Sequence, residues 1–289
     1  MSAVLDELVT LLALEQLEHN LFRGQSQDLG WGLVFGGQVL GQALSAAVQT
    51  VDGDRTVHSL HGYFLRPGLA SKPIVYDVDR IRDGKSFTTR RVVAIQDGRP
   101  IFNMSASFQT EEVGFDHQAP MPQGPGPDGL MNEHEAWQER LDRIPKAFHK
   151  RVEAERPIEI RDVDPVDPLQ PEVAGPSHDV WVRASGKLPD DPALHRHLLA
   201  YCSDFAFMTT SLRPHRATWL DPTMQVASLD HAMWFHRPFR MDEWLLHSID
   251  SPSASGARGL VRGSFFTRDG ELVASTAQEG LIRRRGKST

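Results

Sequence analysis

The 289-residue sequence has a single cysteine, Cys202, and no run of eighteen apolar residues. One cysteine cannot form an intrachain disulfide, which is typical of a protein that folds in a reducing compartment. A transmembrane helix needs about 18 consecutive apolar residues, so the sequence predicts none. Residues 1–18 carry acidic side chains among their leucines and lack the basic start of a signal peptide. We therefore expect a cytoplasmic protein that does not bind membranes.

The sequence also has fewer basic than acidic residues. Lysine and arginine number 31 against 38 aspartates and glutamates, which gives a formal net charge of −7. Broad contact with nucleic-acid phosphates requires an excess of basic side chains, so we expect no nucleic-acid partner. A local basic cluster could still bind one small phosphorylated ligand.

Several catalytic and cofactor motifs are absent. No Gly-x-Ser-x-Gly occurs, which excludes the nucleophile turn of an α/β-hydrolase. Residues 124–129 match the dinucleotide-binding letters Gly-x-Gly-x-x-Gly, but prolines fill the gaps and no strand precedes them, so the match is fortuitous. His195 and His197 are two residues apart and would point in different directions on a helix. We expect no metal site and no cofactor, and Cys202 is more typical of a core residue than of a nucleophile.

An internal repeat is present. Phe64–Pro67 recurs in pattern as Phe235–Pro238, and an Asp-Gly pair follows each at nearly the same distance, as Asp97–Gly98 and Asp269–Gly270. Each pair lies between runs that are typical of strands, and Asp-Gly is a strong hairpin signal because both turn positions tolerate positive φ. We therefore predict an antiparallel sheet in each half. The arginine in each repeated motif indicates a shared structural role.

Each half also has a predicted helix ahead of its strands. Residues 36–47 place Gly37, Gly41 and Ser45 four apart on one face. Each glycine costs a helix about 1 kcal/mol relative to alanine, so we expect a close backbone approach to compensate. A helix lying tightly in the curve of a sheet would have that approach.

The second predicted helix starts at Asp191, which can cap it, with Pro192 at its first position. Apolar residues recur at helical spacing from Leu194 to Met208. The pattern predicts one helix through this stretch. Asp204 would then lie at the edge of its buried face.

A linker separates the halves. Residues 119–129 contain four prolines and three glycines, which cannot join a sheet. A charged stretch at about 132–155 is predicted to be helical. We predict an N-terminal domain at 1–115, a linker with a charged helical segment at 116–156, and a C-terminal domain at 157–289 that carries the catalytic residues.

Four segments, residues 36–44, 57–68, 228–238 and 253–259, resemble the bacterial acyl-CoA thioesterase II family and occur in the family's order. The similarity runs from about residue 11 to 282. The resemblance implies an α+β double hotdog, in which two long helices are each wrapped by an antiparallel β-sheet and the sheets join side by side. It also implies an acyl-CoA substrate and a homo-oligomer, with a tetramer as the family precedent.

The family uses an Asp, a Thr or Ser, and a Gln, which match Asp204, Ser228 and Gln278. Thioester hydrolysis needs a water that is polarised and aimed at the carbonyl carbon. A partly buried carboxylate can take a proton from that water, and a hydroxyl and an amide can fix its direction. We expect Asp204 to be the base and the other two to position the water. Serine lacks the methyl group of the threonine that many members carry, so its rotamer is less restricted.

Secondary candidates complete the predicted site. His58 is a candidate for acid–base help or site architecture, and the backbone N–H groups of Gly36 and Gly37 are candidates to stabilise the thioester oxygen. Aligning the two Asp-Gly turns puts Ala106 opposite Gln278, so the first half is predicted to lack its own copy of the amide. CoA phosphates favour exposed basic side chains, and the candidates are Arg82, Arg258 and Arg262.

Two other functions fit the same sequence. A hydratase or dehydratase on this fold would place an Asp–His pair at the acyl β-carbon and would favour His58 as the central residue. A non-catalytic acyl-CoA-binding protein would tolerate replacement of Asp204. Thiol release from a long-chain acyl-CoA separates these alternatives from a thioesterase.

Overall fold

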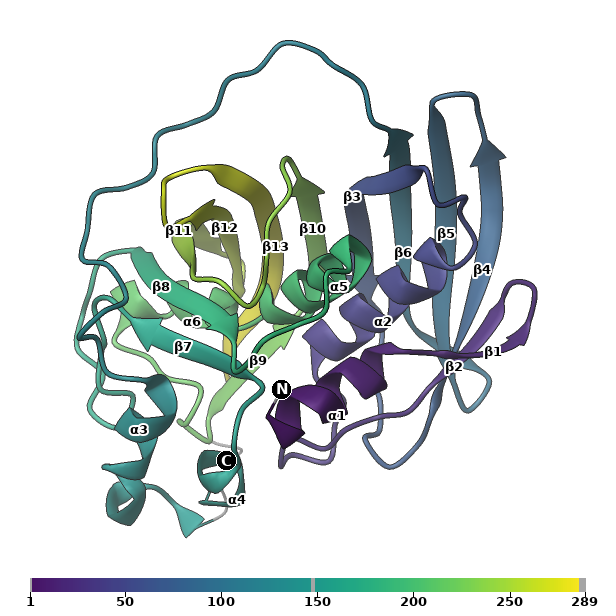
Figure 1. Ribbon diagram of the computed structural model, residues 1–289. Coiled ribbons are helices and arrows are strands. Elements are labelled where there is room, and N and C mark those ends of the chain that lie inside the picture. The colour runs from purple at the N-terminus through teal and green to yellow at the C-terminus, as the bar shows by residue number, and fades with distance from the viewer. Residues whose placement is uncertain (1, 147–148, 286–289) are drawn as a thin grey trace.

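The protein is described by a computed structural model that covers residues 2–146 and 149–285. One 13-stranded antiparallel sheet curves around the helices α2 and α5 (Figure 1). The helices are α1 Ala3–Leu12, α2 Gly36–Val48, α3 Glu133–Gln138, α4 His149–Glu153, α5 Pro192–Cys202 and α6 Phe207–Thr210, with 3₁₀ turns η1 Leu141–Arg143 and η3 Arg213–His215. The strands are β1 Glu15–Glu18, β2 Leu21–Gly24, β3 Arg55–Phe64, β4 Ile74–Asp83, β5 Phe87–Gln96, β6 Arg99–Thr110, β7 Ile158–Asp162, β8 Ser177–Ala184, β9 Met224–Ser228, β10 Asp230–Phe235, β11 Leu245–Ser255, β12 Arg258–Thr267 and β13 Leu272–Arg284.

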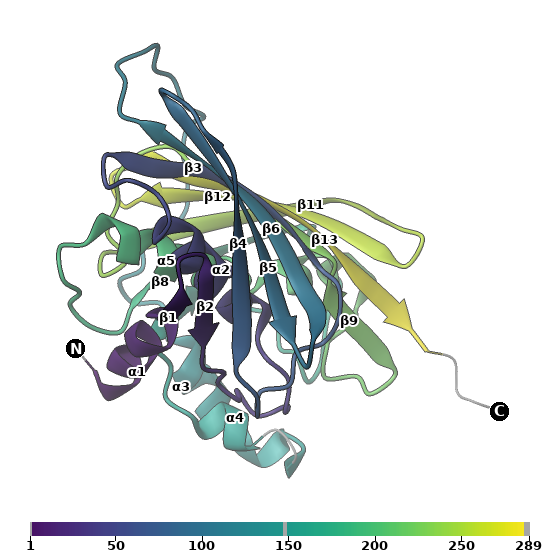
Figure 2. The same ribbon diagram turned by 90° about the vertical axis from the view of Figure 1, so that its right-hand side faces the viewer.

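The two halves of the chain meet where β3 pairs with β10. The strand order is β1-β2-β4-β5-β6-β3-β10-β13-β12-β11-β8-β7, with β9 pairing separately with β13. Leu60 of β3 lies opposite Met233 of β10 in an antiparallel register. The sheet therefore continues from one half into the other, and Figure 2 shows the helices gathered on one side of it. The predicted antiparallel strands of both halves are confirmed.

The first predicted hairpin turn is confirmed, and the second has a different geometry. Asp97 and Gly98 both have positive φ, 51° and 70°, between β5 and β6. Between β12 and β13, Gly270 alone of the two predicted turn residues has positive φ, at 91°. The Thr267 N–H donates to the Glu271 carbonyl at 2.9 Å, so this turn is wider. The same Asp-Gly dipeptide therefore occurs in two different types of turn.

The repeated arginines make equivalent contacts. Arg66 Nη1 donates to the Pro100 carbonyl at 2.7 Å, and Arg237 Nη1 donates to the Leu272 carbonyl at 2.9 Å. Each acceptor follows its hairpin glycine by two residues. The predicted structural role of these arginines is confirmed. The two halves share not only the sequence pattern but also this hydrogen bond.

The glycines of α2 allow the two central helices to meet. A methyl group on Gly37 would lie under 3.0 Å from the Tyr201 carbonyl, and one on Gly41 would lie 3.1 Å from the His197 carbonyl. Both acceptors belong to α5, so its backbone runs directly against α2. The close approach predicted from the glycine spacing is confirmed, and it brings the first turn of α2 to the end of α5.

The second helix is shorter than the sequence pattern predicts. α5 ends at Cys202, and the Phe205 N–H bonds to the Cys202 carbonyl at 3.0 Å, which tightens the chain into a turn. Ala206 has a φ of 59°, and the left-handed conformation interrupts the helix before α6 begins. Asp204 therefore lies in the turn between α5 and α6, and its predicted helical position is wrong.

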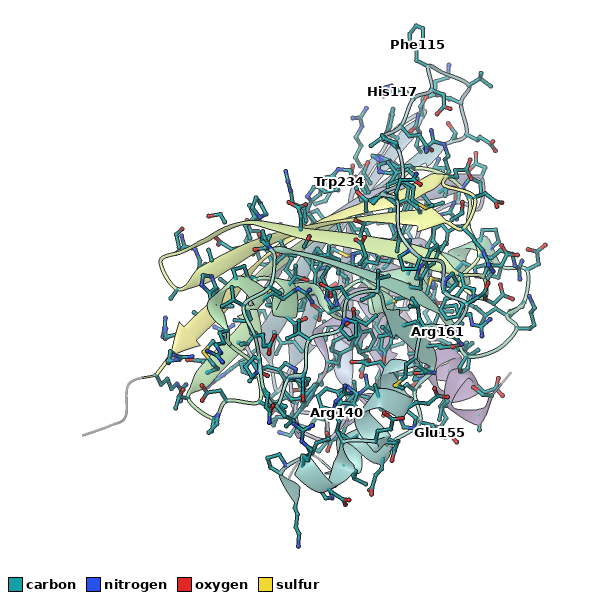
Figure 3. All side chains as sticks on the ribbon, turned by 90° about the vertical axis from the view of Figure 1, so that its left-hand side faces the viewer. Phe115, His117, Arg140, Glu155, Arg161 and Trp234 are labelled. Atoms are coloured by element: carbon teal, nitrogen blue, oxygen red, sulfur yellow. The ribbon has the colours of Figure 1, made fainter. Side chains whose placement is uncertain are left out.

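The connection between the two halves lacks regular secondary structure where its prolines and glycines predict a linker. Residues 111–131 form no helix or strand, and the chain arches from β6 toward α3 (Figure 1). Phe115 and His117 lie near the tip of this arch (Figure 3). The predicted charged helix is divided into α3, η1 and α4, and residues 147–148 within it lie outside the described part of the chain. Within residues 2–146 and 149–285, no helix has the length and apolarity that crossing a bilayer requires.

The packing of α2 against α5 predicts that Gly37→Ala destabilises the protein. Helix propensity alone would make Gly37→Ala stabilising by about 1 kcal/mol. Because the added methyl would overlap the Tyr201 carbonyl, we expect a loss of about 1–3 kcal/mol in the free energy of unfolding. Urea unfolding measures it. Gly53→Ala is the control, since nothing lies within 4 Å of the added methyl. A Gly37→Ala protein as stable as the parent would contradict the close approach.

Candidate active site

Three predicted polar side chains meet in one hydrogen-bonded cluster. Ser228 Oγ donates to Asp204 Oδ1 at 3.2 Å, and Gln278 Nε2 donates to the same oxygen at 3.1 Å. Gln278 Nε2 also lies 2.8 Å from Ser228 Oγ. Segments far apart in the sequence therefore bring a carboxylate, a hydroxyl and an amide together.

The elements that hold these side chains explain the convergence. Asp204 follows α5 in the turn before α6, Ser228 ends β9, and Gln278 lies within β13. β9 pairs with β13 so that Ser228 lies opposite Gly280, two residues beyond Gln278. Side chains alternate along a strand, so Gln278 points to the buried face of the sheet, toward the helices. The site thus lies between the sheet and the helix ends.

The amino end of α2 forms another side of the site. The Gly37 N–H donates a hydrogen bond to the Asp204 carboxylate. A methyl group on Gly36 would lie 2.6 Å from Asp204 Oδ2, so glycine leaves room for the carboxylate. The predicted role of the Gly36 and Gly37 N–H groups as donors to the thioester oxygen stays a prediction, and N–H groups in the first helical turn have no partner within the helix.

Burial sets the proton affinity of Asp204. Desolvation raises the pKa of Asp204 to about 6, against hydrogen bonds from Gln278, Ser228 and the Gly37 N–H that lower it. Such a carboxylate is mostly ionised at pH 7 and still binds a proton more strongly than an exposed aspartate. It has the properties of a general base.

A second polar pair lies behind the cluster. Gln278 Oε1 is 2.5 Å from His231 Nδ1, and His231 Nε2 is 2.9 Å from Ser203 Oγ. All three side chains are buried. Sequence reasoning gave neither His231 nor Ser203 a role, although His231 falls within a motif shared with the thioesterase family.

His58 is not brought to the cluster. Its Nε2 lies 2.8 Å from Ser107 Oγ, and its ring packs edge-on against Phe87. Phe64, at the other end of β3, contacts the position of Gly36. Six residues of extended strand separate His58 from Phe64, roughly 20 Å. The predicted contribution of His58 to this site therefore has no geometric support.

The predicted CoA-binding arginines lie away from the cluster as well. Arg258 and Arg262 project from β12 on the face opposite to Val261, which pairs with Gln278. Both are ion-paired, Arg258 with Glu279 at 2.8 Å and Arg262 with an aspartate at 2.6 Å. Exposed Trp234 lies on this outer side of the sheet (Figure 3). Arg82 lies near the β4–β5 hairpin of the first half.

A cavity of about 400 Å³ lies near the turn that carries Asp204, and none of the three clustered side chains lines it. Its lining includes Phe205 and Ala206, the two residues that follow Asp204 in the chain. It lies between the segment that carries α3, where Arg140 is labelled in Figure 3, and the elements β7, β8 and α6. Much of its wall is apolar, including Trp137, Ile160, Val180, Leu212 and Trp219.

No metal centre accompanies these features in the described ranges. Across residues 2–146 and 149–285, no three His, Cys, Asp or Glu side chains are grouped so that they could hold a metal ion. The cluster's own donors and acceptors are those of a site that binds and orients a small polar molecule.

Known proteins resemble this chain over nearly its whole length. A family model described as acyl-CoA thioesterase matches residues 148–281, and one described as the acyl-CoA thioesterase N-terminal domain matches residues 26–109. The chain is 44% identical to acyl-CoA thioesterase 2 of Haemophilus influenzae, covering 98% of this chain and 99% of that protein. It is 42% identical to acyl-coenzyme A thioesterase 8 of Homo sapiens, covering 96% and 88%.

Solved structures agree with the sequence comparison. An acyl-CoA thioesterase II from Mycobacterium marinum has a TM-score of 0.79 and 44% identity, covering 96% of this chain and 99% of that one. A hot dog fold protein from Alicyclobacillus acidocaldarius has a TM-score of 0.77 at 19% identity, covering 97% and 99%. The second likeness concerns the fold alone, and together they identify the hotdog fold.

The raised pKa of Asp204 is directly measurable. We expect its carboxyl carbon to titrate near pH 6 in an NMR experiment on the folded protein, because burial disfavours the charged form. Asp204→Asn, which lacks the titrating group, assigns the resonance. Titration near pH 4, the range of an exposed aspartate, would contradict the environment described for this side chain.

Proposed function

The chain belongs to the acyl-CoA thioesterase family and is a thioester hydrolase, and we propose that it hydrolyses fatty acyl-CoA through a water molecule held by Asp204, Ser228 and Gln278. The observation that carries this proposal is the cluster in which both Ser228 and Gln278 donate to Asp204 Oδ1. These bonds hold the carboxylate in one orientation and leave Oδ2, beside Gly36, to take the proton of a water.

The proposed reaction balances without a cofactor. The water oxygen bonds to the thioester carbonyl carbon as Asp204 accepts one of the water protons. The tetrahedral intermediate then collapses, the C–S bond breaks, and the CoA sulfur leaves with the proton that Asp204 had taken. The products are a free fatty acid and CoA. General-base assistance of this kind is typically worth about 10²–10⁴ in rate.

The negative charge on the intermediate oxygen needs a donor. We assign this role to the Gly36 N–H, which lies at the positive end of α2, in the turn that borders the Asp204 carboxylate.

The hotdog fold is proposed in its double form, with α2 and α5 each wrapped by one half of the sheet. The β3–β10 pairing and the equivalent arginine contacts support this arrangement. The domain limits 1–115, 116–156 and 157–289, the cytoplasmic location and the homo-oligomer stay predictions.

The alternative functions have less support. A hydratase or dehydratase centred on His58 would need that side chain beside the aspartate, and His58 instead bonds to Ser107. A non-catalytic binding protein would have no need for an aspartate whose pKa is raised to about 6 within a hydrogen-bonded cluster. The basicity of Asp204 is a property that hydrolysis uses.

The cavity beside Phe205 and Ala206 is proposed to hold the acyl chain. The chain is the apolar part of an acyl-CoA, and burying it in an apolar cavity contributes binding free energy for each methylene. Trp137 and Trp219, packed against each other with ring centroids 6.1 Å apart, belong to the wall. Because α3 belongs to the connection between the two halves, this segment would help to select chain length.

Two substitutions test the proposed chemistry. We expect Asp204→Asn and Gln278→Ala each to lower kcat on a long-chain acyl-CoA by more than about tenfold, because one removes the base and the other removes a positioning donor. Thiol release measures turnover, and circular dichroism and thermal unfolding verify the fold. Folded variants as active as the parent would refute the assignment.

A separate pair of variants tests the proposed chain site. Ala136 lines the cavity from α3, and we expect Ala136→Trp to lower kcat/KM for long-chain acyl-CoA by about tenfold or more by filling the space. Activity on acetyl-CoA should be unchanged. Glu135→Trp is the matched control, because Glu135 is the exposed neighbour on the same helix. An equal loss at every chain length, or none, would contradict this site.

A further inference from the structure

Gln278 has a buried polar support that the proposed reaction does not use. Its Oε1 lies 2.5 Å from His231 Nδ1, and His231 Nε2 lies 2.9 Å from Ser203 Oγ. Ser203, His231 and Gln278 are at most 1% exposed. This chain of contacts starts one residue before Asp204 and ends at the amide that donates to Asp204.

The contacts of Gln278 define which way its amide faces. Its Nε2 points to Asp204 Oδ1 and Ser228 Oγ. If the amide were turned over, its oxygen would face the carboxylate oxygen, and two acceptors would repel each other. The donor that favours the correct orientation is the group facing Oε1, which is His231 Nδ1.

Only one arrangement satisfies both ring nitrogens of a neutral His231. Nδ1 must carry the proton in order to donate to Gln278 Oε1, and Nε2 must then accept the Ser203 hydroxyl proton. Burial lowers the pKa of His231 to about 4, so the imidazole is neutral at pH 7. If the Ser203 hydroxyl donated to the Ala200 carbonyl instead, at 2.9 Å, Nε2 would need the ring proton and Nδ1 would repel Gln278 Oε1.

The repeat shows that the sheet does not require this pair in order to fold. Leu60 and His231 both lie four residues before the repeated phenylalanine, and Ala106 and Gln278 both lie eight residues after the hairpin glycine. Leu60 pairs with Ala106 across β3 and β6, and the β10–β13 register places His231 opposite Gln278. Apolar side chains fill in the first half the positions that the histidine and amide occupy in the second.

We propose that His231 is a positioning residue, fixed by Ser203, that locks the Gln278 amide with its NH₂ group toward Asp204 and Ser228, the groups that face the attacking water. This inference rests on the proposed function, because it gives His231 a catalytic consequence only through Gln278. His231 itself touches no reacting atom.

The test is a double-mutant cycle between positions 231 and 278. His231→Leu introduces the side chain that the first half already has at the equivalent position. We expect it to lower kcat on a long-chain acyl-CoA by roughly ten- to a hundredfold with little change in KM, because a misplaced positioning group acts on turnover. In the Gln278→Ala background the same substitution should have no further effect, since the group it positions is gone.

A conservative variant separates positioning from packing. His231→Asn can place an amide N–H near the position of Nδ1, and we expect it to restore kcat to within about threefold of the parent. A role limited to core packing would make this smaller side chain at least as harmful as leucine. Ser203→Ala gives a second route, with a smaller loss of kcat that also disappears when Gln278 is alanine, and it decides the question if His231→Leu does not fold.

The outcomes distinguish this inference from the function on which it rests. An undiminished Gln278→Ala enzyme would overturn the proposed function itself. Suppose that Gln278→Ala lowers kcat but His231→Leu does not, or that His231→Leu lowers kcat by the same factor in the Gln278→Ala background as in the parent. Either result would overturn only the positioning role of His231. Loss of kcat in the parent background alone, with rescue by asparagine, is the result expected.

Discussion

The contact between the amino end of α2 and the carboxyl end of α5 is the constraint on which the rest of the site depends. Gly36 and Gly37 have no side chains to separate the helices, so the Asp204 carboxylate reaches the first turn of α2 and accepts the Gly37 N–H. The same approach buries the carboxylate and raises its pKa. One helix packing arrangement therefore holds the aspartate in place and makes it a stronger base.

The two halves of the chain share a backbone design and differ in chemistry. Arg66 and Arg237 anchor equivalent corners in the two halves of the sheet. The first half fills its equivalent strand positions with apolar side chains, whereas the second has a histidine and an amide. The first half therefore contributes packing and the α2 end, and the second contributes the polar groups. Neither half has all the parts of the site without the other.

Local rules predicted much of this fold. Asp97–Gly98 adopts the two positive φ angles that its residue types favour, and the glycine spacing in α2 indicated the close approach to α5. The end of α5 could not be predicted, because the apolar pattern continues through Phe205 and nothing marks Ala206 for a left-handed φ. Tertiary packing decides that turn, and it moves Asp204 from a helix into a loop.

The candidate site was predicted by resemblance and not by residue type alone. Asp204, Ser228 and Gln278 match a family pattern, whereas a histidine within a strand, such as His231, carries no local signal of its partner. Residue type alone makes His58, Arg258 and Arg262 candidates, and the sequence does not show which residues lie next to them in the fold. Pairing across β10 and β13 is long-range information, which spacing along the chain does not contain.

In the proposed reaction, one water held by three side chains attacks the thioester. A crystal structure with a non-hydrolysable ketone analogue of acyl-CoA, in which a methylene separates the sulfur from the carbonyl, tests it most directly. We expect an ordered water within hydrogen-bonding distance of Asp204, Ser228 and Gln278 and facing the ketone carbon. A ketone bound in another cavity, or one in direct contact with the Asp204 carboxylate and no intervening water, would contradict it.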